Sequence, residues 1–594
     1  MFLKSIMFQI NYRKLRNIAW SSFSVSETSH INSTDSSNNS NSSSNHYNPY
    51  DLISVQGYNP IYDRFFTMSP TNYNQVCFDT TREFLDPETV VCDQKKIKAS
   101  THIKFAPLLD PIHYLIGKYD RDKQKIMQLP DLNKDGYPKI CNPDNASYVD
   151  CFFNFLCSKM KHQHNFPNAI DFYGSYLAIQ KEFLFDATDD FSYLQESEYF
   201  RRKRDILYRI EDDGETEWSK QNMKNTHSHR PKVSIEINHL DVDIVDENSV
   251  EDSDIKIETS EDDEEMEMIY HVSTNEKKVD HESDSEDSSN NSVISNSSSD
   301  DDDEDEDEDE DNDDDEEDED EDEDNDKDMD SHSSSSSSDT QIQVFIKDFP
   351  VQLICMEKCD GTLDQLLVEE EIKEHEINSA LSQIIFSLLA FQKSFDFTHN
   401  DLHTNNIVYV KTDAKFIVYT YQNIKYYVPT YGRLFKMIDF GRAIFKFQDK
   451  LFCSDSFAEG GDAHTQYNFP PYWNPAKPAI HPNPSFDLCR LGCSMFDFVF
   501  EEDEDATDTW NMNRLQKTVL RWCIDDMGKN ILYKKNGDER YPNFKLYKMI
   551  ARYVHNHTPE KELQESMIQK YTKKPKKFSD AIWVSIDALP VYWV

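Results

Sequence analysis

Residues 399–406 read His-Asn-Asp-Leu-His-Thr-Asn-Asn, and residues 438–441 read Ile-Asp-Phe-Gly. Each stretch adjoins a segment rich in Ile, Val, Phe and Tyr, a composition that predicts short strands. Two acids and an amide therefore stand beside predicted strands, at Asp401, Asn406 and Asp439. We expect these three oxygen-bearing side chains, which are far apart along the chain, to converge at one site.

Two carboxylates and an amide are the groups that phosphoryl transfer needs. One carboxylate positions the attacking hydroxyl and accepts its proton, while the second carboxylate and the amide oxygen hold Mg²⁺ against the phosphates. Mg²⁺ prefers hard oxygen ligands, keeps several waters and needs few protein ligands. Gly441, directly after Phe440, would let the backbone bend away from the metal.

The same residues carry a resemblance to the protein kinase superfamily, in a divergent form similar to serine/threonine kinases. The catalytic-loop pattern H-x-D-L-x-x-x-N is met by His399, Asp401 and Asn406, and the pattern D-F-G is met from Asp439 onward. The resemblance implies ATP and Mg²⁺ as cofactors. It also implies that Asp401 is the catalytic base and that Asn406 and Asp439 are metal ligands.

Two further segments resemble the same family. The apolar run that ends at Met356 is similar to the fifth strand and hinge, so Met356 would be the gatekeeper and the backbone from Glu357 to Cys359 would bind adenine. The segment that begins at Asp487 is similar to the start of the large helix of the C-lobe. By resemblance, Asp487 hydrogen-bonds the catalytic-loop backbone and acts, with His399, as structural support.

The phosphate-binding lysine is less clearly marked. Lys104 is the best candidate, since it lies in a short predicted strand at 102–105; an exposed strand lysine is the alternative. The helix expected over 146–161 contains no Glu, and Asp150 is its only acid, so we expect Asp150 to pair with Lys104. No G-x-G-x-x-G loop precedes these elements.

Two positions of the catalytic loop depart from the family pattern. Asn400 replaces the usual Arg, which argues against switching by phosphorylation, and His403 replaces the usual Lys. The leading hypothesis is a protein kinase that transfers the ATP γ-phosphate to a serine or threonine hydroxyl of a protein. The alternatives are a pseudokinase, which would act as a scaffold, and a small-molecule phosphotransferase, which His403 would suit.

The expected fold class is α+β, with a two-lobed protein-kinase-like fold of a small β-rich N-lobe and a mainly helical C-lobe. Residues 1–49 are Ser- and Asn-rich and expected to be largely disordered. Residues 50–211 would form the first part of the N-lobe, and 212–342 a long disordered acidic insertion. Residues 343–594 would complete the N-lobe and add the hinge and the C-lobe.

The chain has 594 residues and a formal net charge of −50. Between Asp300 and Asp330 there are 27 Asp and Glu residues against one Lys, so this tract has like charges that repel and little apolar surface to bury. It argues against direct nucleic-acid binding. Basic proteins are plausible partners for it, beside the protein substrate, and a solvated tract without a partner is the alternative.

The 11 Cys residues show no zinc-finger spacing and are expected to be free thiols of a reducing compartment. No apolar run is long enough to span a membrane. We therefore expect an intracellular protein, cytoplasmic or in a virion or host cell, that is not secreted. The Asn, Ser and Asp runs are similar in composition to those of proteins from AT-rich genomes, giant DNA viruses among them.

Overall fold

The computed structural model describes residues 10–23, 47–119, 123–133, 135–188, 190–211, 342–500, 512–534 and 537–593. These residues form a mixed α+β structure with several small sheets, which confirms the class expected from the sequence. All of them belong to one compact unit. The segment expected to be a disordered acidic insertion, 212–342, lies outside the described residues except for Ile342.

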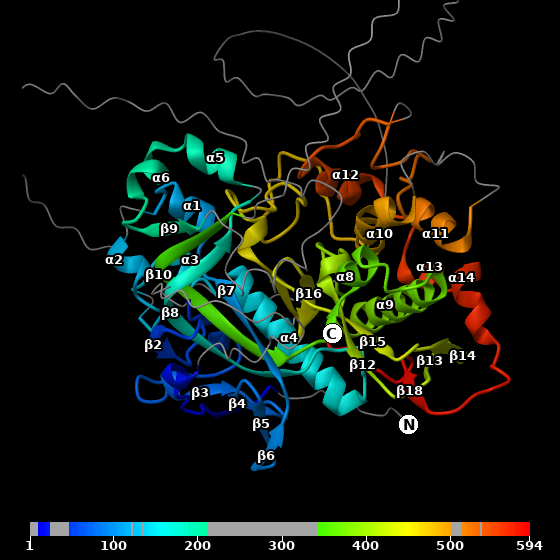
Figure 1. The fold of residues 1–594 in the computed structure, drawn as a ribbon, viewed down its shortest axis with the longest axis horizontal. Coiled ribbons are helices and arrows are strands. Elements are labelled where there is room, and N and C mark those ends of the chain that lie inside the picture. The colour runs from blue at the N-terminus through cyan, green and yellow to red at the C-terminus, as the bar shows by residue number, and fades with distance from the viewer. Residues whose placement is uncertain are drawn as a thin grey trace, which may run out of the picture. The chain divides into compact units, whose positions relative to one another are not determined.

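The largest sheet has the strand order β2-β8-β10-β7, with β9 also paired to β10 (Figure 1). Its strands are β2 (Leu52–Gln56), β7 (Thr101–Pro107), β8 (Phe172–Asp186), β9 (Tyr208–Glu211) and β10 (Gln343–Glu357). Long stretches of β8 and β10 are buried on both faces, because their sequences are nearly continuous apolar runs. β7 pairs with β10 so that Lys104 lies opposite Ile354.

The residues that flank the acidic segment on its two sides are neighbours in this sheet. β9 ends at Glu211, β10 begins at Gln343, and these two residues are paired across the antiparallel ladder. The described chain on either side of the segment is therefore held in register by β9 and β10.

Helix α4 (Ala146–His164) is the helix that the sequence predicted over 146–161. Asn145 caps its start, since its side-chain oxygen accepts a hydrogen bond from the Ser147 amide at 3.0 Å. Asn165 ends it in the left-handed conformation, with φ of 52°. The middle of α4 is buried all round, because it contacts β8 and β10 and also the chain beyond residue 439. Buried polar residues of α4, Asp150 and Asn154 among them, are hydrogen-bonded to one another or to neighbouring elements.

The remaining helices lie mostly after the large sheet. The longest is α9 (Glu374–Phe395). The spacing of Ile and Leu over 377–389 predicts a helix with one buried stripe; the helix is present, but every residue from Ile377 to Phe391 is buried, so it is buried on all sides. The others in this region are α8 (Leu363–Val368), α10 (Phe486–Val499), α11 (Arg514–Trp522), α12 (Lys545–Tyr553), α13 (Pro559–Glu562) and α14 (Ser566–Gln569). Along the chain, short helices also connect the strands of the large sheet. Between β7 and β8 lie α1 (Pro111–Leu115), α2 (Lys123–Ile126) and α3 (Pro138–Cys141), and between β8 and β9 lie α5 (Phe191–Glu196) and α6 (Glu198–Lys203).

The strands predicted between 407 and 438 form two pairs. β12 (Ile407–Lys411) pairs with β15 (Arg433–Met437), and β13 (Phe416–Tyr421) forms a hairpin with β14 (Ile424–Pro429). The alternation of residues in this region predicts hairpins, and the structure contains one of them, β13–β14, enclosed by the β12–β15 pair. A strand near the C-terminus, β18 (Ala581–Ser585), joins β13 in parallel, although the sequence predicted only helices after residue 485. That prediction is wrong for β18, because a five-residue strand is defined by its distant partner rather than by its own pattern.

The N-terminal region corrects a second expectation. Residues 1–49 were expected to be largely disordered, but β1 (Tyr12–Lys14) pairs with β3 (Val76–Phe78). The side chain of Trp20 is buried and stacks on Phe84 with 5.3 Å between ring centroids. The expectation is wrong for residues 10–23, because their apolar side chains join the core; the Ser- and Asn-rich composition belongs mainly to residues 24–46, which lie outside the described residues.

Short strands complete the fold. β4 (Glu83–Asp86), β5 (Thr89–Cys92) and β6 (Lys95–Lys98) form a three-stranded meander, β16 (Ile444–Phe447) pairs with β17 (Lys450–Cys453), and β11 (Gly361–Thr362) adds to β12. No helix in the described part of the chain is both long enough and apolar enough to cross a membrane.

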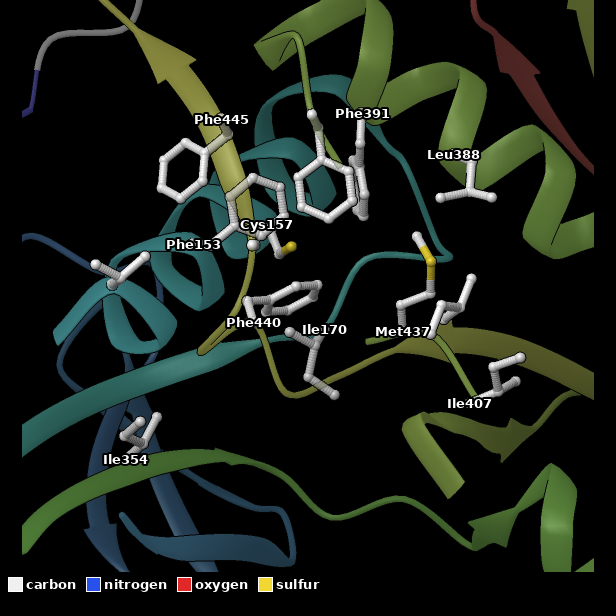
Figure 2. Packing of buried hydrophobic residues seen from close by; sticks show 14 of the residues in the cluster. Phe153, Cys157, Ile170, Ile354, Leu388, Phe391, Ile407, Met437, Phe440 and Phe445 are labelled. Atoms are coloured by element: carbon white, nitrogen blue, oxygen red, sulfur yellow. The ribbon is translucent and has the colours of Figure 1, made fainter. Parts of the chain in front are cut away.

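One aromatic cluster connects α4 to the chain that follows residue 439. Figure 2 shows Phe153 of α4 surrounded by Phe440, Phe445 of β16 and Phe391 of α9. The ring centroids of these three residues lie 4.7, 4.7 and 5.4 Å from that of Phe153. Aromatic contacts at these separations add to the free energy gained from burying the rings.

We expect Phe153→Ala to lower the free energy of unfolding by about 3–5 kcal/mol, because a fully buried ring would leave a cavity that its neighbours cannot fill. Urea denaturation followed by tryptophan fluorescence measures the change. Ile97→Ala is the matched control, since Ile97 is exposed on β6 and its loss should change the free energy by less than about 0.5 kcal/mol. Equal effects of the two variants would contradict the prediction.

Candidate active site

The loop at 399–406 is fixed through its backbone. Asp487, buried near the start of α10, accepts hydrogen bonds from the amides of His399 and Asn400, each at 2.9 Å. The ring Nε2 of His399 donates to the carbonyl oxygen of Ile438 at 3.0 Å. Asp487 and His399 therefore make contacts suited to structural supports, and His399 joins this loop to the second polar stretch.

Two residues of the site adopt the left-handed conformation without being glycine. Asn400 and Asp439 both have φ of 65°, which costs about 1–2 kcal/mol for a residue with a side chain. The Asn400 side chain offsets part of this cost, because its Nδ2 donates to the carbonyl of Arg442 at 2.9 Å and its Oδ1 accepts from the Tyr467 hydroxyl at 2.6 Å. Backbone strain of this kind collects at functional sites.

Lys104 joins three elements. Its Nζ lies 2.8 Å from Oδ2 of Asp150 in α4 and 2.7 Å from Oδ1 of Asp439. Asp150 is buried and also accepts hydrogen bonds from the Phe440 amide at 2.9 Å and from Nδ2 of Asn154 at 2.8 Å. The predicted pair between Lys104 and Asp150 is present, and the Asp439 stretch is held against α4 by the same contacts.

The charge of Lys104 is secured by these neighbours. Burial alone would lower its pKa, but the carboxylates of Asp150 and Asp439 outweigh burial and raise the pKa above its ordinary value. In turn, burial would raise the pKa of Asp439, and Lys104 outweighs this and lowers it. Both groups are therefore charged at neutral pH.

Asn406 presents one particular atom to the site. Its Nδ2 donates to the carbonyl oxygen of Asp401 at 2.9 Å and to Nε2 of His403 at 3.1 Å. The main-chain carbonyl oxygen of Asn406 accepts a hydrogen bond from the Ile438 amide at 3.0 Å. Because the amide nitrogen is tethered twice, the side-chain oxygen of Asn406 is the atom left for a ligand, beside the 438–441 stretch.

Asp401 is surrounded by positive or donating groups. Its Oδ1 accepts a hydrogen bond from the Tyr547 hydroxyl at 2.7 Å, and its Oδ2 lies 3.8 Å from the guanidinium of Arg442. Burial would raise the pKa of Asp401, but Arg442, then His403, lower it well below its usual range. Burial lowers the pKa of His403 to about 4, so this ring is neutral at physiological pH.

The side chains present suit a magnesium ion. Asp439 is about half exposed, and Lys104 occupies only one of its carboxylate oxygens. The other oxygen and the side-chain oxygen of Asn406 are hard ligands of the type that Mg²⁺ takes, with water and phosphate completing its shell. Within the described residues, no cluster of three or more His, Cys, Asp and Glu side chains could hold a metal by itself. The residues therefore fit an ion bound together with a phosphate ligand.

The residues expected to bind adenine lie at the end of β10, next to the strand that carries Lys104. Met356 is nearly buried, opposite His102 of β7. The Glu357 side chain turns inward, where it pairs with Lys161 at 2.8 Å and with Lys436. The Glu357 amide donates to the carbonyl oxygen of Asp171 at 2.9 Å, so neither its side chain nor its amide is left for a ligand. The Cys359 amide hydrogen-bonds to no backbone group of the described residues.

The segment after Asp439 is also anchored to the start of α4. Asp455 is almost fully buried, and its Oδ1 accepts a hydrogen bond from the Ala146 amide at 3.1 Å. Its Oδ2 pairs with Lys139 at 2.9 Å. A carboxylate at a helix N-terminus is favourable, since the free amides and the helix dipole attract negative charge there. This contact holds α4, and with it Asp150, in a fixed position.

Sequence reasoning missed three residues of the site: Arg442, Asp455 and Tyr547. Arg442 directly follows Gly441 and could have been found from that position. Asp455 and Tyr547 belong to segments without a recognised motif, and their partners lie far away along the chain. No local signal in the sequence marks either residue.

Comparisons with known proteins add one short similarity. No protein-family model matches the chain. A stretch of 79 residues is 39% identical to "Uncharacterized protein 098R" of Invertebrate iridescent virus 6. The match covers 13% of this chain and 13% of that protein, so it spans about an eighth of each.

We expect Asp455→Ala to speed amide hydrogen exchange in the first turn of α4, because the Ala146 amide loses its acceptor and Lys139 loses its partner. Hydrogen exchange measured by mass spectrometry reports this change peptide by peptide. Glu459→Ala is the control, since Glu459 is an exposed acid of the same segment. Unchanged exchange in α4 for Asp455→Ala would show that Asp455 does not anchor the helix.

Proposed function

We propose that this chain is a Mg²⁺-dependent protein kinase that transfers the ATP γ-phosphate to a serine or threonine hydroxyl of a protein. The observation that carries the proposal is the position of Lys104, which lies within 2.8 Å of both Asp150 and Asp439. Asn406 and Asp401 lie on the loop that is hydrogen-bonded to the same stretch through His399. Phosphoryl transfer is catalysed mainly by positioning and by charge stabilisation, and these side chains offer both.

The proposed roles are those that the resemblance implies, and the contacts of these side chains support them. Lys104 would bind phosphate oxygens, since it is charged and partly exposed between two acids. Asp439 and Asn406 would hold Mg²⁺, which supplies charge neutralisation on the phosphates when it is bound. Asp401, which is ionised, would accept the proton of the attacking hydroxyl. The backbone of Glu357 and Cys359 would bind adenine at the end of β10.

We also propose the two-lobed fold that the resemblance implies. The sheet of β2, β7, β8 and β10, together with α4, would be the small lobe, and the helices from α8 onward the large one. What supports this arrangement is that the catalytic groups divide between the two parts: Lys104 and Asp150 come from the first, and Asp401 and Asn406 from the second.

A binding module that keeps the fold without turnover is the second candidate. Two observations favour it. Among the described residues, β7, which carries Lys104, is an edge strand of its sheet, and the sequence has no glycine-rich loop to cover this lysine. Such a module would bind basic partners through the acidic segment. A small-molecule acceptor, suggested by His403, is the third possibility, and a panel of acceptors distinguishes it from a protein kinase.

We expect the purified chain to transfer phosphate from Mg²⁺-ATP to a panel of generic protein substrates, and Asp401→Asn to lower kcat by about 10²–10⁴-fold through loss of the proton acceptor. Incorporation of labelled phosphate measures the rate, and chelation of the metal should abolish it. Nucleotide binding without transfer would favour the binding module. Transfer to small hydroxyl compounds alone would favour the third candidate. Equal turnover of the wild type and Asp401→Asn would remove Asp401 from its role.

We expect Lys104→Met to weaken Mg²⁺-ATP binding by about 10–100-fold, because a charge-assisted contact to phosphate contributes about 1.5–3 kcal/mol. Isothermal titration calorimetry measures the dissociation constant. Lys98→Met is the matched control, since Lys98 is exposed on β6 and should leave the affinity unchanged. If both variants bound the nucleotide as tightly as the wild type, Lys104 would not be the phosphate-binding lysine.

A further inference from the structure

We propose that Tyr547 of α12 is a positioning residue for Asp401: its hydroxyl holds one carboxylate oxygen so that the other faces the acceptor hydroxyl. This inference rests on the proposed function. The contact joins residues 146 positions apart, since the Tyr547 hydroxyl donates to Oδ1 of Asp401 at 2.7 Å. It is the one hydrogen bond that the Asp401 carboxylate accepts within the described part of the chain.

The direction of this hydrogen bond is fixed by a third residue. Nε of Arg490, in α10, donates to the Tyr547 oxygen at 2.9 Å. Because the phenol oxygen already accepts from Arg490, its own proton is left to point at Asp401. Burial, with Asp401 adding to it, raises the pKa of Tyr547 to about 12, so the proton stays on the tyrosine throughout the physiological range.

The ring of Tyr547 is buried and packed tightly against its neighbours. Only 5% of the residue is exposed. Its ring stacks on Phe544 at 5.4 Å and meets Phe486 at 6.3 Å between centroids. The guanidiniums of Arg442 and Arg490 lie 5.4 and 5.1 Å from its centre. Because two aromatic rings and two guanidinium groups fix the ring, its hydroxyl can set the rotamer of a carboxylate with little loss of entropy.

The other groups that act on Asp401 do not orient its carboxylate: the Nε of Arg490, whose charge lowers the pKa of Asp401, donates to the Tyr547 oxygen instead. His403 has a neutral ring, and its Nε2 accepts from Asn406. Arg442 is 3.8 Å from Oδ2, too far for a hydrogen bond, and its Nε and Nη2 are bound to Asp462 at 3.1 and 2.7 Å. Arg442 thus stabilises the negative charge of Asp401 but does not fix the orientation of its carboxylate. Oδ2 of Asp401 stays open on a side chain that is 25% exposed, as a proton acceptor for an incoming hydroxyl requires.

Tyr547→Phe tests the proposal, because phenylalanine keeps the ring packing and removes only the hydroxyl. With Mg²⁺-ATP and the best protein acceptor, we expect kcat to fall about 10–100-fold, the loss typical of a residue that orients a reacting group. KM for ATP should stay within about twofold.

Tyr421→Phe is the matched control, since the Tyr421 hydroxyl donates to Glu560 at 2.9 Å on the exposed part of β13. It loses a hydroxyl–carboxylate contact of the same kind and should leave kcat and KM for ATP unchanged. Thermal unfolding of each variant shows whether it folds. Should Tyr547→Phe fail to fold, Arg490→Lys replaces it, because the Tyr547 oxygen then loses the donor that orients its proton; a smaller fall in kcat with an unchanged KM for ATP is expected.

The outcomes separate the proposal from the function on which it rests. A wild-type chain that transfers no phosphate overturns both. An active wild type whose Tyr547→Phe variant keeps its kcat overturns only the role of Tyr547, as does a variant in which KM for ATP rises together with the fall in kcat. A rise in kcat would also overturn it, because the hydroxyl would then be occupying the acceptor position.

Discussion

The site depends on one electrostatic contact, in which the partly exposed Lys104 ammonium lies between the buried carboxylate of Asp150 and the half-exposed carboxylate of Asp439. The Asp150 carboxylate is stable in its buried position only when it is paired, and removing the partner of such a buried charge typically costs about 3–5 kcal/mol. The contact therefore ties β7, α4 and the Asp439 stretch to one another. Asp455 at the start of α4 and the aromatic cluster around Phe153 hold the same helix in place, so electrostatics and packing support one geometry.

The sequence predicted the parts of the site whose residues are close together along the chain. The order of Asp401 and Asn406 within one loop, and the strands that flank it, follow from local spacing and alternation. The pair of Lys104 with Asp150 was predicted by elimination, since the helix holds only one acid, and the structure contains it. Asp455 and Tyr547 could not be predicted, because their contacts depend on how segments 309 and 146 residues away fold back.

The same physical limit explains the errors in the fold. α9 is predicted from its own spacing, because a helix closes its hydrogen bonds within itself and shows its period in its own sequence, whereas α4 is expected only through the resemblance. β18 and β1 are short strands whose hydrogen bonds all go to distant chain, so their few residues carry little signal. Composition misled in the N-terminal region, because a Ser- and Asn-rich stretch dominated the average while Ile18 and Trp20 were enough to anchor residues 10–23 in the core.

The pairing of Glu211 with Gln343 has a consequence for how this chain can change over time. Because the two ends of the intervening 131 residues already sit side by side, the closure entropy of that stretch grows only with the logarithm of its length. A change in the length of this acidic stretch therefore costs little free energy of folding. Selection on the length and charge of this stretch can then proceed independently of selection on the catalytic groups, because β9 and β10 fix its two ends whatever its length.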